Sequence, residues 1–362
     1  MDEDSRLGLY ADLGCVRKGD TVFFYQRRID EPRAERGFRG IYEVIEEPFF
    51  DDLDLEWEGN VVRGKCPHCK NYYSEKPGND AAVCPSCRGR LNLTEHILPN
   101  RVLIKPKEYY ENPVDDNTAY IDRTDPGTIW TMLFRKIYGP GRERSVTPIL
   151  PEEAEKLVRL LRRVNDNKTT SFPSKPYRPT MKPININLGS GPTVPYENTL
   201  LAWMTRNIDN EYPTLREVVG PVGELEFFGD QVLYGIGGEK VDLLCLHKRD
   251  NIRYKATVFE LKKDSLDQKS VAQISDYSYW IAQLVTANLP YPVENFVIQP
   301  VLIGYRVAKK ALPLLQQMDI KKFKIPYQKP CEVTIFQPIV ITYSVSHGSI
   351  NFQIEDGLLD FI

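Results

Sequence analysis

The sequence predicts a multidomain protein, in which a β-rich N-terminal domain with a small cysteine-containing insertion precedes an α/β domain with a mixed central sheet. A chain of 362 residues is too long for one ordinary hydrophobic core. Its first half holds short runs of β-branched and aromatic residues, interrupted by two Cys-x-x-Cys pairs. Its second half alternates apolar runs of strand length with helical patterns, which is typical of the α/β class. We expect the two domains to span residues 1–165 and 196–362.

The composition is that of a soluble globular protein, with 41% hydrophobic and 27% charged residues. A net charge of -3 gives no overall basic surface, so any contact with nucleic acid must depend on local patches. No apolar run approaches the ~20 residues that span a bilayer. The first residues, MDEDSR, are polar and are not followed by the apolar segment of a signal peptide. We therefore expect a cytoplasmic protein without a membrane partner.

The N-terminal domain begins with two predicted strands and ends with a helix. The runs GDTVFFYQRR and GIYEVIEEPFFDD are rich in β-branched and aromatic residues, as strands are. A helix is predicted over 151–164, because Pro151 suits a first helical turn and the two glutamates that follow favour the positive end of the helix dipole. The apolar face of this helix consists of Leu157, Leu160, Leu161 and Val164.

Four of the seven cysteines form the two pairs CPHC and CPSC, which are separated by fourteen residues. Four thiolates can close a tetrahedron around zinc, and each two-residue spacer lets one turn present two sulfurs. A redox pair is the alternative, but nothing else in the chain is thioredoxin-like. We expect a zinc ribbon inserted at 64–92, in which the metal is structural. Its predicted ligands are Cys66, Cys69, Cys84 and Cys87. The other three cysteines are single, which favours a reducing compartment over a disulfide framework.

Residues 166–195 are rich in proline and glycine and have no apolar periodicity. This composition predicts a semi-extended linker between the two domains.

The C-terminal domain contains one conspicuous acidic residue in its predicted sheet. The expected elements are a helix over 196–208, strands over 225–234, 239–247 and 254–262, a helix over 271–288, a strand over 295–305, a helix over 308–318, and a hairpin that turns at His347–Gly348. The run KVDLLCL is almost continuously apolar, as a strand covered on both faces should be. Asp242 interrupts this run, and a carboxylate is costly to bury there unless it binds something.

The hairpin between these strands brings a second carboxylate to Asp242. If it closes symmetrically about Asn251, Asp242 faces Glu260, with Cβ atoms about 5 Å apart. Two facing carboxylates repel each other unless a hard divalent cation such as Mg²⁺ lies between them. Glu260 and Lys262 lie on one side of the strand, since side chains alternate. Taken alone, this Glu-x-Lys pair could equally be a surface ion pair.

The N-terminal strand pair and the closing helix resemble the EVE branch of the PUA-like domains. The resemblance rests on the GD-apolar-FY strand, on the Glu-Pro-aromatic turn and on RSVTPILPEEAEKLVRLL. It implies a β-barrel that binds RNA or reads modified bases in an aromatic pocket. A pocket for a flipped base needs flat apolar walls, although core packing is the alternative for any single aromatic. The candidate aromatics are Tyr25, Tyr42, Phe49, Trp57 and Trp130.

The C-terminal domain resembles the PD-(D/E)xK nuclease superfamily, which has the restriction-endonuclease-like fold. GGEKVDLLCL, VFELKK and QISDY are most similar to its RecB and NucS branches, in which a Gln-x-x-x-Tyr helix follows the Glu-x-Lys strand. The resemblance implies that Asp242, Glu260 and the backbone carbonyl of Leu261 bind Mg²⁺ or Mn²⁺. It also implies that Lys262 orients the attacking water.

The same resemblance assigns supporting residues outside the hairpin. Gln273 and Tyr277 lie one helical turn apart and share a face, from which they would support the site or the substrate phosphate. Glu197 matches the upstream acidic residue of the family only loosely. Its alternative role is that of a helix N-terminal acid that interacts with the helix dipole.

Together these features predict a metal-dependent DNA endonuclease whose N-terminal domain selects modified, mismatched, single-stranded or branched DNA. A carboxylate-bound Mg²⁺ stabilises the negative charge that develops during phosphodiester hydrolysis. The alternatives are a non-catalytic nucleic-acid-binding protein and an RNA-processing nuclease. A homodimer would suit cleavage of both strands, because two active sites are then related by a two-fold axis.

Overall fold

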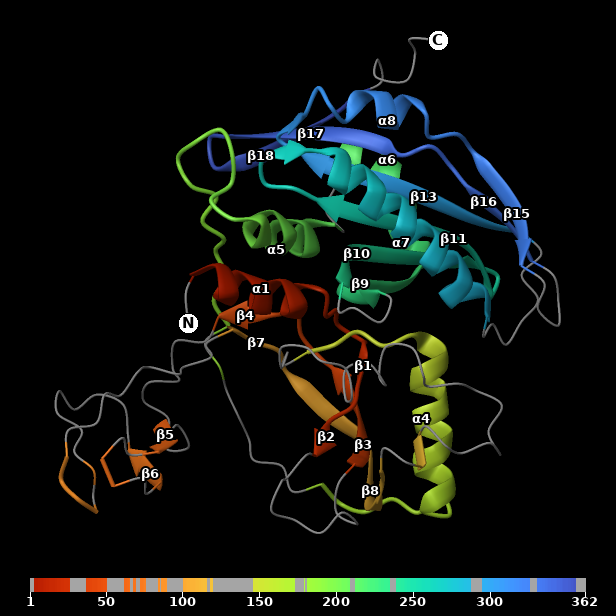
Figure 1. Ribbon diagram of the computed structural model, residues 1–362. Coiled ribbons are helices and arrows are strands. Elements are labelled where there is room, and N and C mark those ends of the chain that lie inside the picture. The colour runs from red at the N-terminus through yellow and green to blue at the C-terminus, as the bar shows by residue number, and fades with distance from the viewer. Residues whose placement is uncertain are drawn as a thin grey trace.

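The computed structural model describes residues 3–26, 37–50, 62–65, 68–69, 72–75, 84, 86–89, 100–115, 118–119, 146–172, 179, 181–208, 212–234, 239–287, 295–325 and 331–355. These residues form a mixed α/β protein with one large mixed sheet and one small antiparallel sheet (Figure 1). Among the described helices, none combines the length and the apolar character that crossing a bilayer requires.

The large sheet has eight strands, and its central strand β13 has parallel neighbours. The main strand order is β15 (Lys321–Ile325), β16 (Cys331–Ile335), β13 (Asn295–Gly304), β11 (Ile252–Leu261), β10 (Glu239–Arg249) and β9 (Leu225–Tyr234). Strand β17 (Ile339–Ser346) also pairs with β13 and carries β18 (Ser349–Ile354) on its other side. β13 runs parallel to β11, β16 and β17, whereas β9, β10 and β11 are antiparallel neighbours. The predicted mixed sheet is therefore present.

Helices cover both faces of the large sheet. α7 (Gln268–Ala287) and α8 (Leu312–Gln316) pack on one face, whereas α1 (Glu3–Gly14), α5 (Glu197–Asn207) and α6 (Pro213–Val219) pack on the other. Strand alternation divides the core in the same way, because Leu244 and Val258 join the α7 side while Leu243 and Phe259 join the α5 side. Figure 1 shows α1 beneath α5, although the small sheet separates them in sequence.

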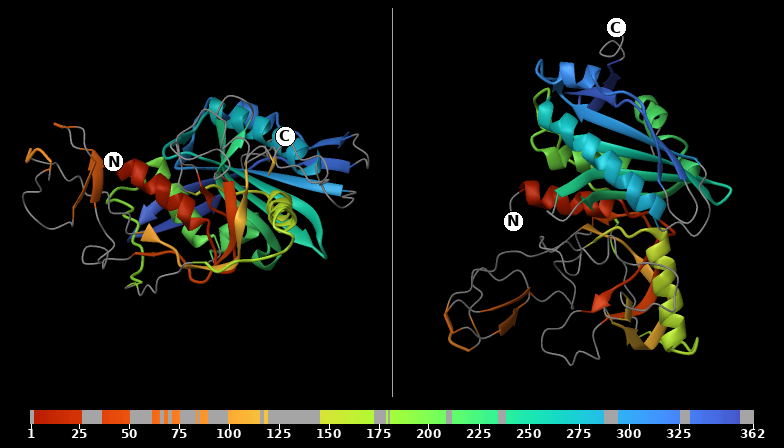
Figure 2. Two further views of the ribbon diagram at one scale, coloured as in Figure 1. Left: turned by 90° about the horizontal axis from the view of Figure 1, so that it is seen from below. Right: turned by 45° about the vertical axis from the view of Figure 1, so that its right-hand side comes forward.

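The small sheet lies in the N-terminal half and packs against one helix. β3 (Gly37–Val44) pairs with β1 (Thr21–Val22), β2 (Tyr25–Gln26) and β8 (Ile104–Val114). α4 (Pro151–Val164) packs on β3 and β8 through its leucine face. Two short pairs complete this half, β4 (Phe49–Phe50) with β7 (Asn100–Arg101) and β5 (Val62–Lys65) with β6 (Tyr72–Glu75). Figure 2 shows the β5–β6 hairpin apart from both sheets.

Several predicted elements are confirmed, with local causes that the sequence indicated. α4 begins at Pro151, and Glu153 accepts a hydrogen bond of 2.8 Å from the backbone N–H of Leu150. The final hairpin turns at His347 and Gly348, whose φ angles of 51° and 72° suit a type I′ turn. Helices α5 and α7 also lie where they were expected.

One expected helix is shorter than predicted, and one helix was not expected. The helix predicted over 308–318 covers only Leu312–Gln316, because Pro313 fits only the first helical turn and residues 306–307 form strand β14 with β12 (Ser265–Leu266). Helix α1 was not predicted, since its polar sequence shows no apolar periodicity. It forms against α5 on one face of the large sheet, with Tyr10 and Ala11 in the same apolar cluster as Leu200.

The predicted linker contacts the C-terminal core. Apart from one β-bridge between Lys182 and Phe50, its described residues form no helix or strand. Leu188 and Val194 are nonetheless buried in the apolar cluster that contains α5. This part of the chain is therefore held against the domain that it precedes.

A buried ion network joins α4 to the large sheet. The side chain of Arg253, on β11, is 1% exposed. Its Nη1 and Nη2 atoms lie 2.8 and 3.0 Å from the carboxylate oxygens of Glu152 on α4. Its Nε donates to Glu226 on β9 at 2.6 Å. Because a buried guanidinium needs such partners, this network fixes where α4 meets the sheet.

Replacing Arg253 by alanine should destabilise the protein by about 3–5 kcal/mol, because two buried carboxylates then lose their shared cation. The midpoint of urea unfolding, followed by far-UV circular dichroism, measures this change. Arg249→Ala is the matched control, since Arg249 pairs with Glu224 on the exposed surface and its loss should leave the midpoint near that of the wild type. Equal effects of the two substitutions would contradict the importance of the buried network.

Candidate functional site

The two predicted carboxylates meet where β10 and β11 lie side by side. Leu243 pairs with Phe259 and His247 with Lys255, so the strands follow the register predicted about Asn251. The register shifts only beyond His247, at the hairpin end. Asp242 comes directly before Leu243, and Glu260 comes directly after Phe259. In this register the two acidic residues therefore lie opposite each other on neighbouring strands.

The carboxylate of Asp242 is buried and held from two sides. Its Oδ2 accepts a hydrogen bond of 2.7 Å from the backbone N–H of Leu261, and its Oδ1 accepts one of 3.1 Å from Gln231 Nε2. Its side-chain direction is thereby fixed by β9 on one side and by β11 on the other.

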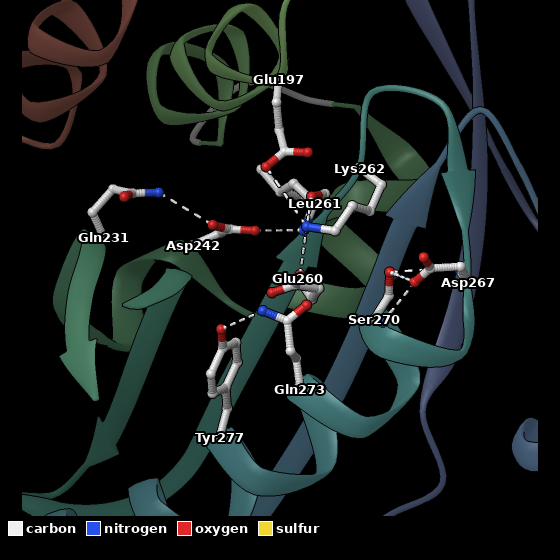
Figure 3. A network of polar contacts seen from close by, with 10 residues as sticks. All are labelled: Glu197, Gln231, Asp242, Glu260, Leu261, Lys262, Asp267, Ser270, Gln273 and Tyr277. Atoms are coloured by element: carbon white, nitrogen blue, oxygen red, sulfur yellow. Dashed lines mark hydrogen bonds and ion pairs between the residues drawn. The ribbon is translucent and has the colours of Figure 1, made fainter. Parts of the chain in front are cut away.

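Lys262 is the cation of the site. Its Nζ lies 2.6 Å from Glu260 Oε1 and 3.6 Å from Glu197 Oε1, and it donates to the carbonyl of Leu261 at 3.1 Å. Figure 3 shows this ammonium group between Glu197, Asp242 and Glu260. Glu260 is almost fully buried, whereas Glu197 at the start of α5 is about half exposed. The structure thus brings all four predicted charged residues together.

The electrostatics of the site disfavour two ionised carboxylates. Burial, followed by the charge of Glu260, raises the pKa of Asp242 well above its usual range. Burial likewise raises the pKa of Glu260, although Lys262 opposes the shift. Burial disfavours the charged form of Lys262, but the surrounding carboxylates outweigh it and raise the pKa of the amine. One ammonium group therefore stabilises two buried acids incompletely, and such a site attracts further positive charge.

The predicted helix residues lie on the same side of the site. Gln273 Nε2 donates to the hydroxyl group of Tyr277 at 3.1 Å, and Tyr277 is buried. Figure 3 shows the Gln273 amide pointing toward Glu260. Within the described part of the chain, its buried Oε1 atom has no hydrogen-bond partner. This oxygen is an acceptor available to a water molecule or a ligand.

Gln231 is the residue of the site that the sequence reasoning missed. It interrupts the pairing of β9 with β10 between Val232 and Asp230, and its φ of 48° is left-handed. This left-handed residue departs from regular strand geometry without a change of register, and its side chain reaches Asp242. The sequence signal was the tripeptide Gly-Asp-Gln inside an apolar run, since a glycine within a strand often marks irregular backbone geometry.

The oxygen atoms of this site suit a hard divalent cation. Carboxylates and backbone carbonyls are the ligands that Mg²⁺ and Mn²⁺ take. Asp242, Glu260 and the carbonyl of Leu261 offer such ligands beside one ammonium group. The chemistry of these oxygen ligands therefore fits a divalent metal ion.

A second group of potential metal ligands lies in the cysteine-containing insertion. The sulfurs of Cys69, Cys84 and Cys87 lie within 4.8 Å of one another, and those of Cys69 and Cys84 are 3.6 Å apart. Thiolates around a tetrahedral zinc are about 3.8 Å apart, given Zn–S bonds of about 2.3 Å. The three cysteines could therefore hold a metal ion and are compatible with structural zinc. Cys66, the fourth predicted ligand, lies outside the described residues.

The aromatic residues predicted for a base pocket mostly serve the core. Tyr42 and Phe49 are buried, and Tyr25 packs on Phe38 with ring centroids 5.0 Å apart. Phe24 is 52% exposed and lies against Tyr42, at 4.9 Å between centroids. Trp57 and Trp130 lie outside the described residues.

Comparison with known proteins does not assign a family. No family model and no solved structure matches the chain. A stretch of 147 residues, 40% of the chain, is 29% identical to glycerophosphocholine phosphodiesterase GDE1 of Eremothecium gossypii. That stretch corresponds to 10% of the curated protein, so the chain spans about a tenth of its relative.

Replacing Glu260 by glutamine should stabilise the metal-free protein by about 1 kcal/mol. The substitution leaves one buried carboxylate, Asp242, beside Lys262, and it removes the repulsion between the two acids. Thermal unfolding in a chelating buffer measures the change. Glu197→Gln is the control, since its half-exposed carboxylate should contribute far less. A lower melting temperature for Glu260→Gln would show that the two carboxylates do not destabilise one another.

Proposed function

We propose that this chain is a metal-dependent DNA endonuclease that hydrolyses phosphodiester bonds. The observation that carries the proposal is the buried pair Asp242 and Glu260 with Lys262 beside it, at the end of a central strand. Buried carboxylates with raised pKa values that lie next to one lysine are uncommon in purely structural cores. They are what a site for a divalent cation and an anionic substrate requires.

In this proposal Asp242, Glu260 and the Leu261 carbonyl hold Mg²⁺ or Mn²⁺. When bound, the ion supplies positive charge and a more acidic water ligand. Gln231 and the backbone N–H of Leu261 keep Asp242 oriented toward the site. Lys262 contacts both Glu260 and the Leu261 carbonyl, so its ammonium group lies beside the residues that would hold the ion.

Lys262 then interacts with the substrate. Its ammonium group orients the attacking water and offsets the negative charge that develops on the phosphate. The unused oxygen of Gln273 accepts a hydrogen bond from that water, while Tyr277 keeps the amide in place. Glu197 holds the ammonium group of Lys262 from the opposite side.

The N-terminal half supplies substrate selection in this proposal, as an EVE-like reader of modified or structurally unusual DNA. Its Cys69–Cys84–Cys87 cluster, completed by Cys66, holds a structural zinc. The partial relative is a phosphodiesterase by name, so it shares the proposed class of bond. Its name does not distinguish between a nucleic acid and a smaller phosphodiester as the substrate of this chain.

The proposal is tested with a panel of plain, methylated, mismatched, single-stranded and branched DNA in Mg²⁺ or Mn²⁺. The wild type should cleave at least one of these substrates. Glu260→Ala and Lys262→Ala should each reduce the rate by about 100-fold or more, because they remove a metal ligand and a charge-stabilising donor. Glu224→Ala is the matched control, since Glu224 pairs with Arg249 away from the site.

If both site variants cleave as fast as the wild type, the catalytic assignment is wrong. Divalent-independent binding without cleavage would favour the non-catalytic alternative. Faster cleavage of RNA than of DNA in direct competition would favour the RNA-processing alternative, which rests on the RNA-binding members of the PUA-like domains.

The zinc proposal has its own measurement. The purified protein should contain about one zinc per chain, and Cys87→Ser should lose most of it, because three thiolates close the site poorly. Cys331→Ser is the control, as Cys331 is a single buried cysteine in β16. Elemental analysis by mass spectrometry gives the stoichiometry. Equal zinc contents in the two variants would exclude the cluster as the metal site.

A further inference from the structure

Beside the carboxylate site lies a group of basic residues that the reactions described above do not use. We call it the basic rim, and it consists of Lys263, Lys269, Arg306, Lys309 and Lys310. The short pair β12–β14 holds it together, with Ser265 opposite Arg306 and the N–H of Ala308 bonded to the carbonyl of Leu266 at 2.9 Å.

The basic rim carries an excess of unpaired positive charge. Lys269, Arg306, Lys309 and Lys310 are exposed, and Lys263 is partly exposed. Over the described residues, no carboxylate forms an ion pair with any of the four lysines. Arg306 donates to the hydroxyl group of Ser265 at 2.9 Å. This concentration of positive charge is notable in a chain whose net charge is -3.

The two acids within the same segment do not neutralise the basic rim. These acids are Asp264, which is exposed, and Asp267, and the five cations of the basic rim outnumber them. Asp267 is engaged at the start of α7, where it accepts hydrogen bonds from the N–H and the hydroxyl group of Ser270 at 2.9 and 3.0 Å. That bonding lowers the pKa of Asp267 and commits the carboxylate to capping the helix.

The basic rim is continuous with the carboxylate site. Lys263 follows Lys262 directly in the chain. Lys269 lies one helical turn before Gln273 on α7, so it extends the helix face that carries Gln273 and Tyr277. Lys269 lies in the chain between Asp267 and Ser270, which Figure 3 shows at the start of the helix that carries Gln273 and Tyr277.

The usual reason for a lysine-rich strand does not apply to the basic rim. β15 also carries three lysines, Lys321, Lys322 and Lys324, but it is an edge strand of the large sheet, where lysines prevent pairing with another chain. The basic rim follows the central strands β11 and β13 and lies away from the edge strands of the large sheet. Like charges that lie close together and outnumber the nearby carboxylates favour an anionic partner instead.

We propose that the basic rim binds the phosphodiester backbone of the nucleic acid on one side of the bond to be cut. This inference rests on the proposed function, and it identifies where the substrate backbone leaves the site. Contacts from lysine to phosphate give affinity without base preference, so the basic rim would leave sequence or modification reading to other residues.

The test measures binding by the full chain in a Glu260→Ala background, which prevents cleavage during the measurement. Fluorescence anisotropy with labelled duplex DNA, single-stranded DNA and duplex RNA gives dissociation constants over a series of salt concentrations. Lys309→Ala/Lys310→Ala should weaken binding about 10-fold, and it should reduce the slope of log affinity against log salt by about two. Lys321→Ala/Lys322→Ala removes the same charge from the edge strand and should change neither quantity.

Each outcome bears on the basic rim separately from catalysis. If the chain binds nucleic acid and the Lys309/Lys310 variant keeps the wild-type affinity and salt slope, the inference is overturned while the nuclease proposal stands. If the variant weakens binding but the wild-type chain cleaves nothing, the basic rim is supported and the endonuclease proposal fails. Absence of binding to all three nucleic acids overturns both. The three probes also show which nucleic acid supplies the phosphates.

Discussion

The arrangement of the C-terminal domain depends on two carboxylates that a β-hairpin holds together inside the protein. The backbone register of β10 and β11 places Asp242 and Glu260 next to each other, so neighbouring elements must compensate for their negative charge. β9 provides the Gln231 amide, β11 provides a backbone N–H, and Lys262 provides a cation that Glu197 on α5 shares. Compensation remains incomplete, because burial still raises the pKa of both acids. The domain thus gives up some stability for a site that attracts cations, as functional sites commonly do.

The parts of this site that the sequence predicted are those governed by short-range geometry. Strand alternation placed Glu260 and Lys262 on one side, and a symmetric hairpin gave the register that brings Asp242 to Glu260. Helical spacing correctly paired Gln273 with Tyr277. The N-terminal helix α4 was likewise predictable, because its start signals and its leucine face lie within fourteen residues. The specific families suggested by these motifs remain proposals, since the structure establishes only the mixed α/β class.

Sequence reasoning failed where position depends on strands that are distant in the chain. Gln231 reaches Asp242 because it is a left-handed residue that lies opposite Asp242 on the neighbouring strand, and the Gly-Asp-Gln tripeptide does not specify that neighbour. Arg253 lies in the part of the hairpin where the predicted register breaks, and its partner Glu152 belongs to the other half of the chain. Helix α1 is polar by composition and becomes a helix through burial of a few residues against α5. In each of these cases tertiary contacts determine the structure, and local secondary-structure propensity does not.

The position of α1 affects the order in which the chain can fold. Asn198 on α5 donates to Asp4 on α1 at 3.0 Å, and an added Cβ at Gly14 would meet Thr205 on α5. The first helix and its binding surface are thus separated by the whole N-terminal half, which forms a loop closed by their contact. Closing so long a loop is entropically costly, so this contact forms late. A fragment that begins at α5 would lack this helix and would expose the apolar surface of α5, whereas the N-terminal half alone would keep the helix without its main packing partner.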